Sequence, residues 1–235
     1  MIDAEPTPAS PTLSVIVPCW NDASALEKTL SAIRNLDGVL ETIVSDATAG
    51  DDCAHIATQF SATVVRNSVP NRGRQMNAGA AIAAGDIFLF HHADSDLTQA
   101  HISALRTAMA DRAIAGGAFH RKFDTRHRII APFEPVSRIL GKLGGTLYGD
   151  QSIFVRRAIF RALGGFADMP LMEDVEFSKR LRRFGRTIVL DPPMISSARR
   201  HAKNGAWRTS LQNAALIVLY KCGASPERLH QFYYK

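Results

Sequence analysis

The sequence predicts an α/β fold with a mostly parallel central sheet and helices on both of its faces. Short apolar, β-branched runs alternate with stretches of helical periodicity through the first half of the chain. Polar and charged residues gather directly after these runs, where ligands bind in open α/β sheets. With 46% hydrophobic and 21% charged residues, the 235-residue chain can bury a core large enough for such a fold.

Strands are expected where an apolar run is bounded by turn residues. The run from Leu13 to Pro18 ends at a proline, and the run from Ile87 to Phe90 is apolar throughout. The other strands are expected, in chain order, at Leu40–Val44, Thr63–Arg66, Gly116–Phe123, Ser152–Val155 and Thr187–Leu190.

Helices are expected where apolar residues recur at intervals of three or four. Ser24 to Leu36 has this spacing at Leu26 and Leu30, and Asp22 or Ser24 can cap its start. The other helices are expected at Asp51–Phe60, Gly73–Ala84, Thr98–Ala110, Pro132–Leu143, Met172–Phe184, Asn213–Cys222 and Pro226–Tyr234. We therefore expect a disordered tail over residues 1–11, one α/β domain over 12–195 and a helical, basic extension over 196–235.

Composition excludes several classes of protein. No apolar run reaches the eighteen residues that a membrane-spanning helix needs, and the first eleven residues lack the pattern of a signal peptide. The three cysteines, Cys19, Cys53 and Cys222, are far apart and odd in number, so neither a disulfide framework nor a cysteine zinc site is expected. We expect a cytoplasmic protein.

Positive charge is concentrated at the C-terminal end. Ser178 to Lys235 contains twelve Lys or Arg and two acids. This excess suggests either a polyanionic partner, such as an anionic membrane surface, a diphosphate or a nucleic acid, or a solvated helix face. Apolar residues beside the basic ones fit contact with the inner face of the membrane or a lipid-linked acceptor, but a helix packed back onto the domain is the preferred interpretation.

The strongest chemical motif is Asp94-Ser95-Asp96, which follows an apolar strand. Two carboxylates two residues apart can share a hard cation such as Mg²⁺ or Mn²⁺ and face a phosphate group. The alternative is a turn or cap before the next helix. His91 and His92 either add a ligand or pack into the core.

Further candidates follow other strands. Asp46 can accept hydrogen bonds from a base or ribose, or cap the next helix. Arg72 and Arg74 lie near a helix start, where the backbone N–H groups also attract anions, so they suit a diphosphate. No P-loop and no Gly-x-Gly-x-x-Gly pattern is present, which argues against a P-loop ATPase or a dinucleotide oxidoreductase.

Two acids open a helix in the second half. Glu173 and Asp174 are favoured there by the helix dipole alone, but one of them can also serve as a general base for an acceptor hydroxyl. Asp150 and Gln151, which follow a glycine-rich turn, can line the same cleft.

Taken in order, these pieces resemble glycosyltransferase family 2, whose members have the GT-A fold. The resemblance covers Leu13 to Leu190 and is closest to a compact bacterial subgroup associated with radical-enzyme and arsenosugar gene neighbourhoods. The matching segments are Val15–Pro18 with Asn21–Asp22, Ile43–Asp46 with Asp51, Arg72–Gly79, His92–Asp96, Gly149–Gln151 and Met172–Asp174.

The resemblance implies a metal-dependent glycosyltransferase that moves a sugar from a UDP- or GDP-sugar to a small-molecule or lipid-linked acceptor, with no nucleic-acid partner. Asp94 and Asp96 would hold Mg²⁺ or Mn²⁺, and Asp174, with Glu173 as the alternative, would be the base of an inverting displacement. The nucleotide-sugar site would comprise Pro18, Trp20, Asn21, Asp22, Asp46, Arg72, Arg74, Asn77, Asp94, Asp150 and Gln151.

Two departures from the family pattern affect these expectations. Asp46-Ala-Thr-Ala replaces the common Asp-Gly-Gly-Ser or Asp-Asp-Gly-Ser, which leaves loop conformation and base preference open. The Gln-x-x-Arg-Trp motif of processive synthases is not evident, so we predict a single transfer.

Two other functions remain open. A nucleotidyltransferase would normally carry a glycine-rich basic loop after its first strand, where this chain has Pro18-Cys-Trp-Asn21. A non-catalytic nucleotide-binding or membrane-associated protein of the same fold would have no turnover to lose on mutation of Asp174.

Overall fold

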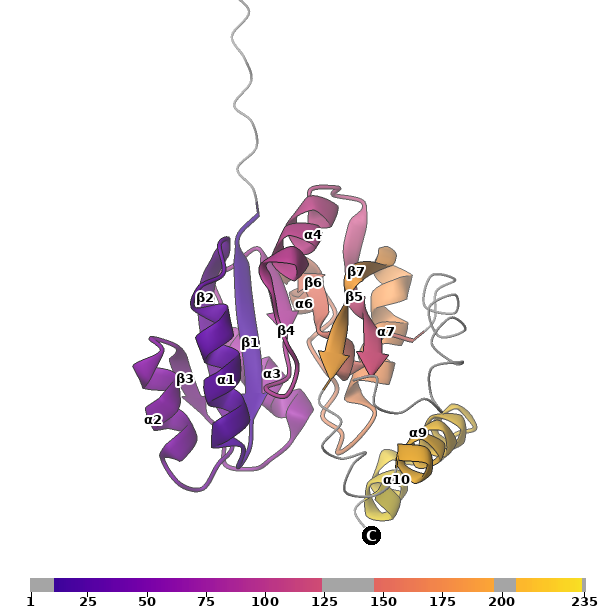
Figure 1. Ribbon diagram of the computed structural model, residues 1–235. Coiled ribbons are helices and arrows are strands. Elements are labelled where there is room, and N and C mark those ends of the chain that lie inside the picture. The colour runs from indigo at the N-terminus through magenta and orange to yellow at the C-terminus, as the bar shows by residue number, and fades with distance from the viewer. Residues whose placement is uncertain (1–10, 124–145, 197–205, 234–235) are drawn as a thin grey trace, which may run out of the picture.

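The computed structural model describes residues 11–123, 146–196 and 206–233, and these contain a seven-stranded sheet (Figure 1). Four of its strand pairs are parallel and two are antiparallel, which confirms the mostly parallel sheet. The expected helix Pro132–Leu143 and the first ten residues of the expected tail lie outside the described residues.

The sheet has the strand order β3-β2-β1-β4-β6-β5-β7. Its strands are β1 (Leu13–Cys19), β2 (Val39–Asp46), β3 (Thr63–Arg66), β4 (Ile87–Phe90), β5 (Ile114–Phe123), β6 (Ile153–Arg156) and β7 (Arg186–Ser196). The first four run parallel to one another, and β6 lies antiparallel between β4 and β5. The sequence located β6 but not its direction, because an apolar run has the same pattern either way.

Strand β7 is longer than the expected Thr187–Leu190. Pro192 and Pro193 argue against a strand in the sequence, since proline cannot donate to a ladder. However, β7 is the last strand in the sheet order, and its pairing with β5 is irregular between Phe119 and Arg121. An edge position with a register shift tolerates proline, so the pairing continues to Phe123 and Ser196.

Successive side chains along each strand point to opposite faces of the sheet, so each face has its own hydrophobic cluster. Val15 and Val17 belong to the cluster that includes residues of α1, α2 and α4, whereas Ile16 packs with residues of α3, α6 and α7. These helices are α1 (Ala23–Ile33), α2 (Asp52–Gln59), α3 (Arg72–Ile82), α4 (Gln99–Met109), α6 (Arg157–Ala162) and α7 (Glu173–Phe184). Asp22 caps α1 by accepting a hydrogen bond from the Ala25 amide at 3.2 Å.

The C-terminal helices α9 (Ala206–Lys221) and α10 (Pro226–Tyr233) pack against the start of α7. Leu216 of α9 and Leu229 of α10 are buried in one cluster with Met172 and Val175. None of the helices in the described part of the chain combines the length and the apolar character that a membrane crossing requires.

Candidate functional site

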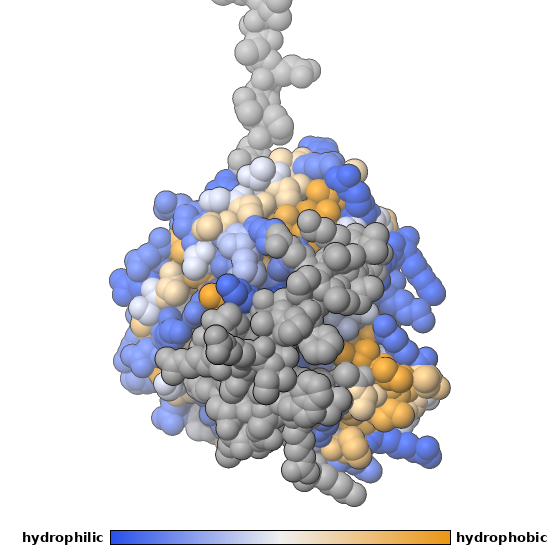
Figure 2. All heavy atoms as spheres, turned by 45° about the vertical axis from the view of Figure 1, so that its right-hand side comes forward, coloured by the Kyte–Doolittle hydropathy of each residue, from blue (hydrophilic) through white to orange (hydrophobic). Residues whose placement is uncertain are grey.

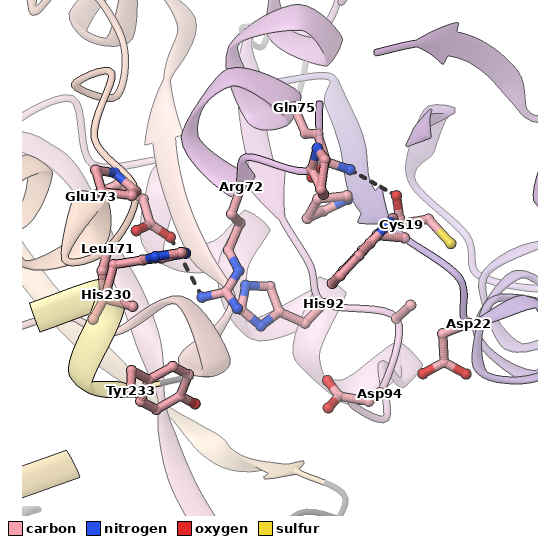
Figure 3. A pocket seen from close by; sticks show the side chains of 15 residues that line it. Cys19, Asp22, Arg72, Gln75, His92, Asp94, Leu171, Glu173, His230 and Tyr233 are labelled. Carbon is pink, nitrogen blue, oxygen red and sulfur yellow. Dashed lines mark hydrogen bonds and ion pairs between the residues drawn. The ribbon is translucent and has the colours of Figure 1, made fainter. Parts of the chain in front are cut away.

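A pocket of about 250 Å³ lies where β1 and β4 end, at the carboxyl edge of the parallel strands (Figure 3). The loops after these two strands, the start of α3, the start of α7 and helix α10 all contribute to its wall. Six of the residues that the sequence predicted for the site line it: Pro18, Trp20, Asp22, Arg72, Asp94 and Glu173.

Buried Gln75 joins the carboxyl ends of β1 and β2. Its side-chain amide donates to the carbonyl oxygens of Cys19 (2.7 Å) and Ser45 (2.8 Å), and it also lines the pocket. Asn21, which has a φ of 51°, donates its backbone N–H to the Thr48 hydroxyl at 2.9 Å. These bonds fix the spacing of the loops that follow the two strands, and Asn21 supports the pocket wall from outside its lining.

Asp46 is completely buried at the end of β2 and does not line the pocket. It accepts from Arg66 Nη1 at 2.7 Å and from the Thr48 amide at 2.8 Å. Arg66 also donates to the Gly50 carbonyl at 2.8 Å, so the loop between β2 and α2 is organised around this ion pair. Arg66 was not predicted as a partner of Asp46, because the two residues come from separate positions in the chain.

The two arginines at the start of α3 have different partners. Arg72 lines the pocket, with Nη1 3.5 Å from Glu173 Oε1. Arg74 lies outside the pocket lining and binds the Asp168 carboxylate at 2.6 and 2.7 Å. Asn77, one turn further, bonds to the backbone of Phe166 on both its amide atoms and therefore joins α3 to that loop.

The two carboxylates after β4 also differ. Asp94 is exposed in the pocket, and within the described residues no hydrogen bond or ion pair engages it. Asp96 forms an ion pair with Lys28 at 2.8 Å and does not line the pocket. Buried His91 bonds to Ser152 and to the Ser95 carbonyl, and burial lowers its pKa to about 4, so it is a neutral core residue.

The carboxylates of Asp94 and Asp96 are compatible with binding of a hard cation. Mg²⁺ and Mn²⁺ favour oxygen ligands and commonly take one or two protein carboxylates together with substrate phosphates. Asp94 fits this requirement as it stands, whereas Asp96 would first have to leave Lys28.

Asp174 is held next to the pocket by two backbone amides. Its carboxylate accepts from Gly149 at 2.7 Å and from Val175 at 2.7 Å. Burial, followed by the charge of Glu173, raises its pKa to about 7. A carboxyl group with a pKa near neutrality is suited to proton transfer.

The turn before β6 shapes the surroundings of Asp174. A Cβ at Gly149 would lie 3.0 Å from His92 Nε2 and 3.5 Å from Asp174 Oδ2, so a side chain here would pack tightly against His92. Asp150 pairs with Arg121 at 2.6 Å, and Gln151 accepts from the Tyr148 amide at 2.9 Å. Neither of these predicted binding residues lines the pocket.

Several residues that line the pocket were not predicted from the sequence. His230 and Tyr233 reach the pocket from α10, and in Figure 3 they lie on the side of Glu173, across from Asp94 and Asp22. The periodicity predicted the helix but not its position against the pocket. Pro170 and Leu171, from the loop before α7, also line the pocket.

Two cysteines that are distant in sequence meet in the fold. The sulfurs of buried Cys19 and Cys53 are 3.3 Å apart, and with Asp46 they form a cluster that could hold a metal ion. Burial raises the pKa of Cys19, which disfavours the thiolate that a metal needs, and Arg66 already pairs with Asp46. The cluster is therefore explained as part of the core.

The sequence profile of the family described as glycosyl transferase family 2 matches residues 14–164. An uncharacterised protein of Mycobacterium tuberculosis is 28% identical, over 83% of this chain and 68% of its own length. YdaM of Bacillus subtilis, which is named as a glycosyltransferase, is 26% identical over 79% of this chain and 50% of its own length.

Solved structures show the same fold. A mannosyltransferase from Pyrobaculum calidifontis, in complex with GDP-Man and Mn²⁺, superposes with a TM-score of 0.71 at 20% identity, covering 96% of this chain and 69% of its own. Glucosyl-3-phosphoglycerate synthase from Mycobacterium tuberculosis, with Mn²⁺, UDP and glucosyl-3-phosphoglycerate, gives 0.61 at 21% identity, covering 92% of this chain and 81% of its own. These likenesses confirm the predicted GT-A-like architecture.

Proposed function

The chain belongs to glycosyl transferase family 2 and is a glycosyltransferase, and we propose that it moves one sugar from a UDP- or GDP-sugar to an acceptor hydroxyl. The observation that supports this proposal is the shared pocket, which a cation (Arg72) and two carboxylates (Asp94 and Glu173) line together. Asp174 follows Glu173 directly in the chain and lies outside the pocket lining, beside this acid that raises its pKa. Two proteins of similar fold were solved with GDP-Man or UDP, each with Mn²⁺.

In the proposed reaction, Asp174 accepts the proton of the acceptor hydroxyl. The hydroxyl oxygen then forms a bond to the anomeric carbon from the face opposite the diphosphate, and the bond to the diphosphate oxygen breaks with its electron pair. Arg72 stabilises the departing diphosphate through charge-assisted hydrogen bonds. The backbone amides of Gly149 and Val175 keep the carboxylate of Asp174 in place for proton transfer.

We also propose that the reaction depends on Mg²⁺ or Mn²⁺. When bound, the cation would neutralise charge on the diphosphate. Asp94 would hold it, joined by Asp96 after exchange from Lys28. The loops around Pro18, Trp20, Asn21, Asp22 and Asp46 would accommodate the nucleoside, with Asp46 acting through the loop that it shapes.

The acceptor is proposed to be a small or lipid-linked molecule that enters beside α10. Pro170, Leu171 and Tyr233 offer apolar contacts there, next to the acidic pair. The resemblance to arsenosugar-associated transferases stays a prediction about this acceptor, and a cytoplasmic location stays a prediction as well. The relatives reported above extend beyond this chain, which spans half the length of YdaM.

The proposal is tested by a thermal-shift screen of UDP- and GDP-sugars, each with and without Mn²⁺. A ligand that binds only the folded state raises stability by about 2.7 kcal/mol at a hundredfold excess over its dissociation constant. We expect a shift with one nucleotide class that grows with Mn²⁺ and is lost in Asp94→Asn. A shift with ATP or CTP and release of pyrophosphate would instead favour a nucleotidyltransferase.

A further inference from the structure

Arg72 and Glu173 form an ion pair inside the pocket, drawn as a dashed line in Figure 3. Arg72 Nη1 lies 3.5 Å from Glu173 Oε1, and both residues line the pocket. The Glu173 side chain is only 4% exposed, whereas that of Arg72 is 38% exposed. The acid is therefore fixed in the wall and the guanidinium can reach toward a ligand.

A buried carboxylate needs a nearby positive charge, because burial removes its hydration. Glu173 also lies beside a second acid, Asp174, so loss of Arg72 would leave two carboxyl groups close together. The other titratable groups that face Glu173 and Asp174 are Tyr148 from the turn before β6, Tyr220 on α9, His92 after β4 and His230 on α10. Among these groups, only the two histidines can become positive.

We propose that Glu173 is a positioning residue that holds Arg72 until the donor arrives, and that the donor diphosphate then takes Arg72 away from it. This inference rests on the proposed function. It separates the roles of the two adjacent acids: Asp174 acts as the base, and Glu173 competes with the diphosphate for one guanidinium. A diphosphate offers Arg72 a bidentate partner, which favours the exchange.

The exchange has a consequence for protons. Arg72 lowers the pKa of Asp174, and Glu173 raises it. When Arg72 turns to the diphosphate, the acidic pair loses part of its neutralising charge, and its affinity for a proton rises. Donor binding near neutral pH is therefore coupled to net proton uptake by the pair, which makes Asp174 a stronger base once the donor is in place.

The test is calorimetric binding of UDP and GDP with Mn²⁺ at pH 7.5, in two buffers of different ionisation enthalpy. At this pH the terminal phosphate, with a pKa of about 6, is ionised and contributes little to the proton balance. We expect wild-type binding to take up a fraction of a proton. Glu173→Gln, which no longer competes for Arg72, should bind the nucleotide at least fivefold more tightly and take up fewer protons.

The matched control is Glu176→Gln, which removes the same charge from the same helix. Glu176 pairs with Arg180 at 2.5 Å and lies outside the pocket lining, so nucleotide affinity should stay within twofold of wild type. Arg72→Leu should weaken binding at least tenfold. Glu173→Gln binding no tighter than Glu176→Gln, or wild-type binding without proton uptake, would overturn the inference.

Two further outcomes keep the test decisive. If Glu173→Gln does not fold, the wild-type proton uptake and its loss in Arg72→Leu decide the question by themselves. A wild-type protein that binds none of UDP, GDP, UDP-glucose and GDP-mannose contradicts the proposed function, whereas normal binding with the wrong response to Glu173→Gln contradicts only the inference.

Discussion

Adjacent residues in this protein have different chemical environments. Glu173 is buried against Arg72, whereas Asp174 accepts two backbone amides. The same contrast separates Arg72, in the pocket, from Arg74, which pairs with Asp168 outside it. The type of a side chain indicates which reactions or contacts it can make. Its direction decides whether it can make them in the pocket.

Replacing Asp174 by Asn should abolish sugar transfer and leave nucleotide binding within threefold of wild type. The amide cannot accept a proton, but it retains the size of the carboxylate. Donor turnover, measured as release of UDP or GDP, and nucleotide affinity check the two parts separately. Glu176→Gln serves as the control, and an Asp174→Asn variant with wild-type turnover would remove Asp174 from the mechanism.

At donor concentrations well below saturation, turnover should rise as the pH increases through about 7, because burial and Glu173 raise the pKa of Asp174 in the donor-free protein to about 7 and the base acts when deprotonated. The same group affects stability in the opposite direction. The pKa of Asp174 in the folded protein lies above the ordinary value of 3.8. The contribution of this group to the free energy of unfolding is therefore complete below pH 3.8 and is lost as the pH rises through about 7. A pH profile of turnover, beside chemical denaturation of wild type and Asp174→Asn, tests both signs; turnover that falls from pH 6 to 8 would contradict the assignment.

At the scale of the element, helix α3 positions the pocket by lying close to the sheet. A Cβ at Gly79 would lie 2.6 Å from Ile16 Cγ2, so this glycine allows the helix to approach β1. The close packing brings Arg72 and Gln75 of the same helix to the ends of the strands.

Gly79→Ala should therefore lower the free energy of unfolding by about 1–3 kcal/mol, the usual cost of overpacking a core. Denaturant unfolding measures this change. Gly50→Ala is the matched control, because a Cβ there meets nothing within 4 Å. Equal stability of the two variants would show that α3 can move away from the sheet without cost.

At the scale of the whole molecule, the C-terminal helices complete the pocket and also carry an exposed apolar surface. Figure 2 shows hydrophobic side chains gathered on this part of the molecule, and Val218, Leu219 and Phe232 are 59%, 45% and 57% exposed. Leu216 of the same helix is buried against the α/β domain. The two expectations for this segment, packing onto the domain and contact with a membrane, are thus compatible.

We predict that the protein sediments with anionic phospholipid vesicles and that added salt reduces this binding. Replacing both Val218 and Leu219 by Asp should abolish it, while Leu40→Asp, at a residue 53% exposed on β2, should not. Vesicle sedimentation with neutral lipid gives the background. Binding that is unchanged in the double variant would remove these residues from the interaction.

We also predict one sugar per acceptor, because the motif of processive synthases is not evident in the sequence. Mass spectrometry of products over time, with an acceptor found by screening, should show a single added sugar at all donor excesses. A ladder of growing products would contradict this prediction.

The sequence by itself determined the alternation of strands and helices, the bounds of β3 and β4, and the family. These features depend on local periodicity and on short motifs, which neighbouring residues specify together. The tertiary structure decided the antiparallel direction of β6, the pairing of buried Asp46 with Arg66, the position of Arg72 in the pocket lining and of Arg74 outside it, and the entry of His230 and Tyr233 into the pocket. Each of these depends on contacts between segments that are distant in the chain, and packing of the whole core fixes such contacts where local pattern cannot.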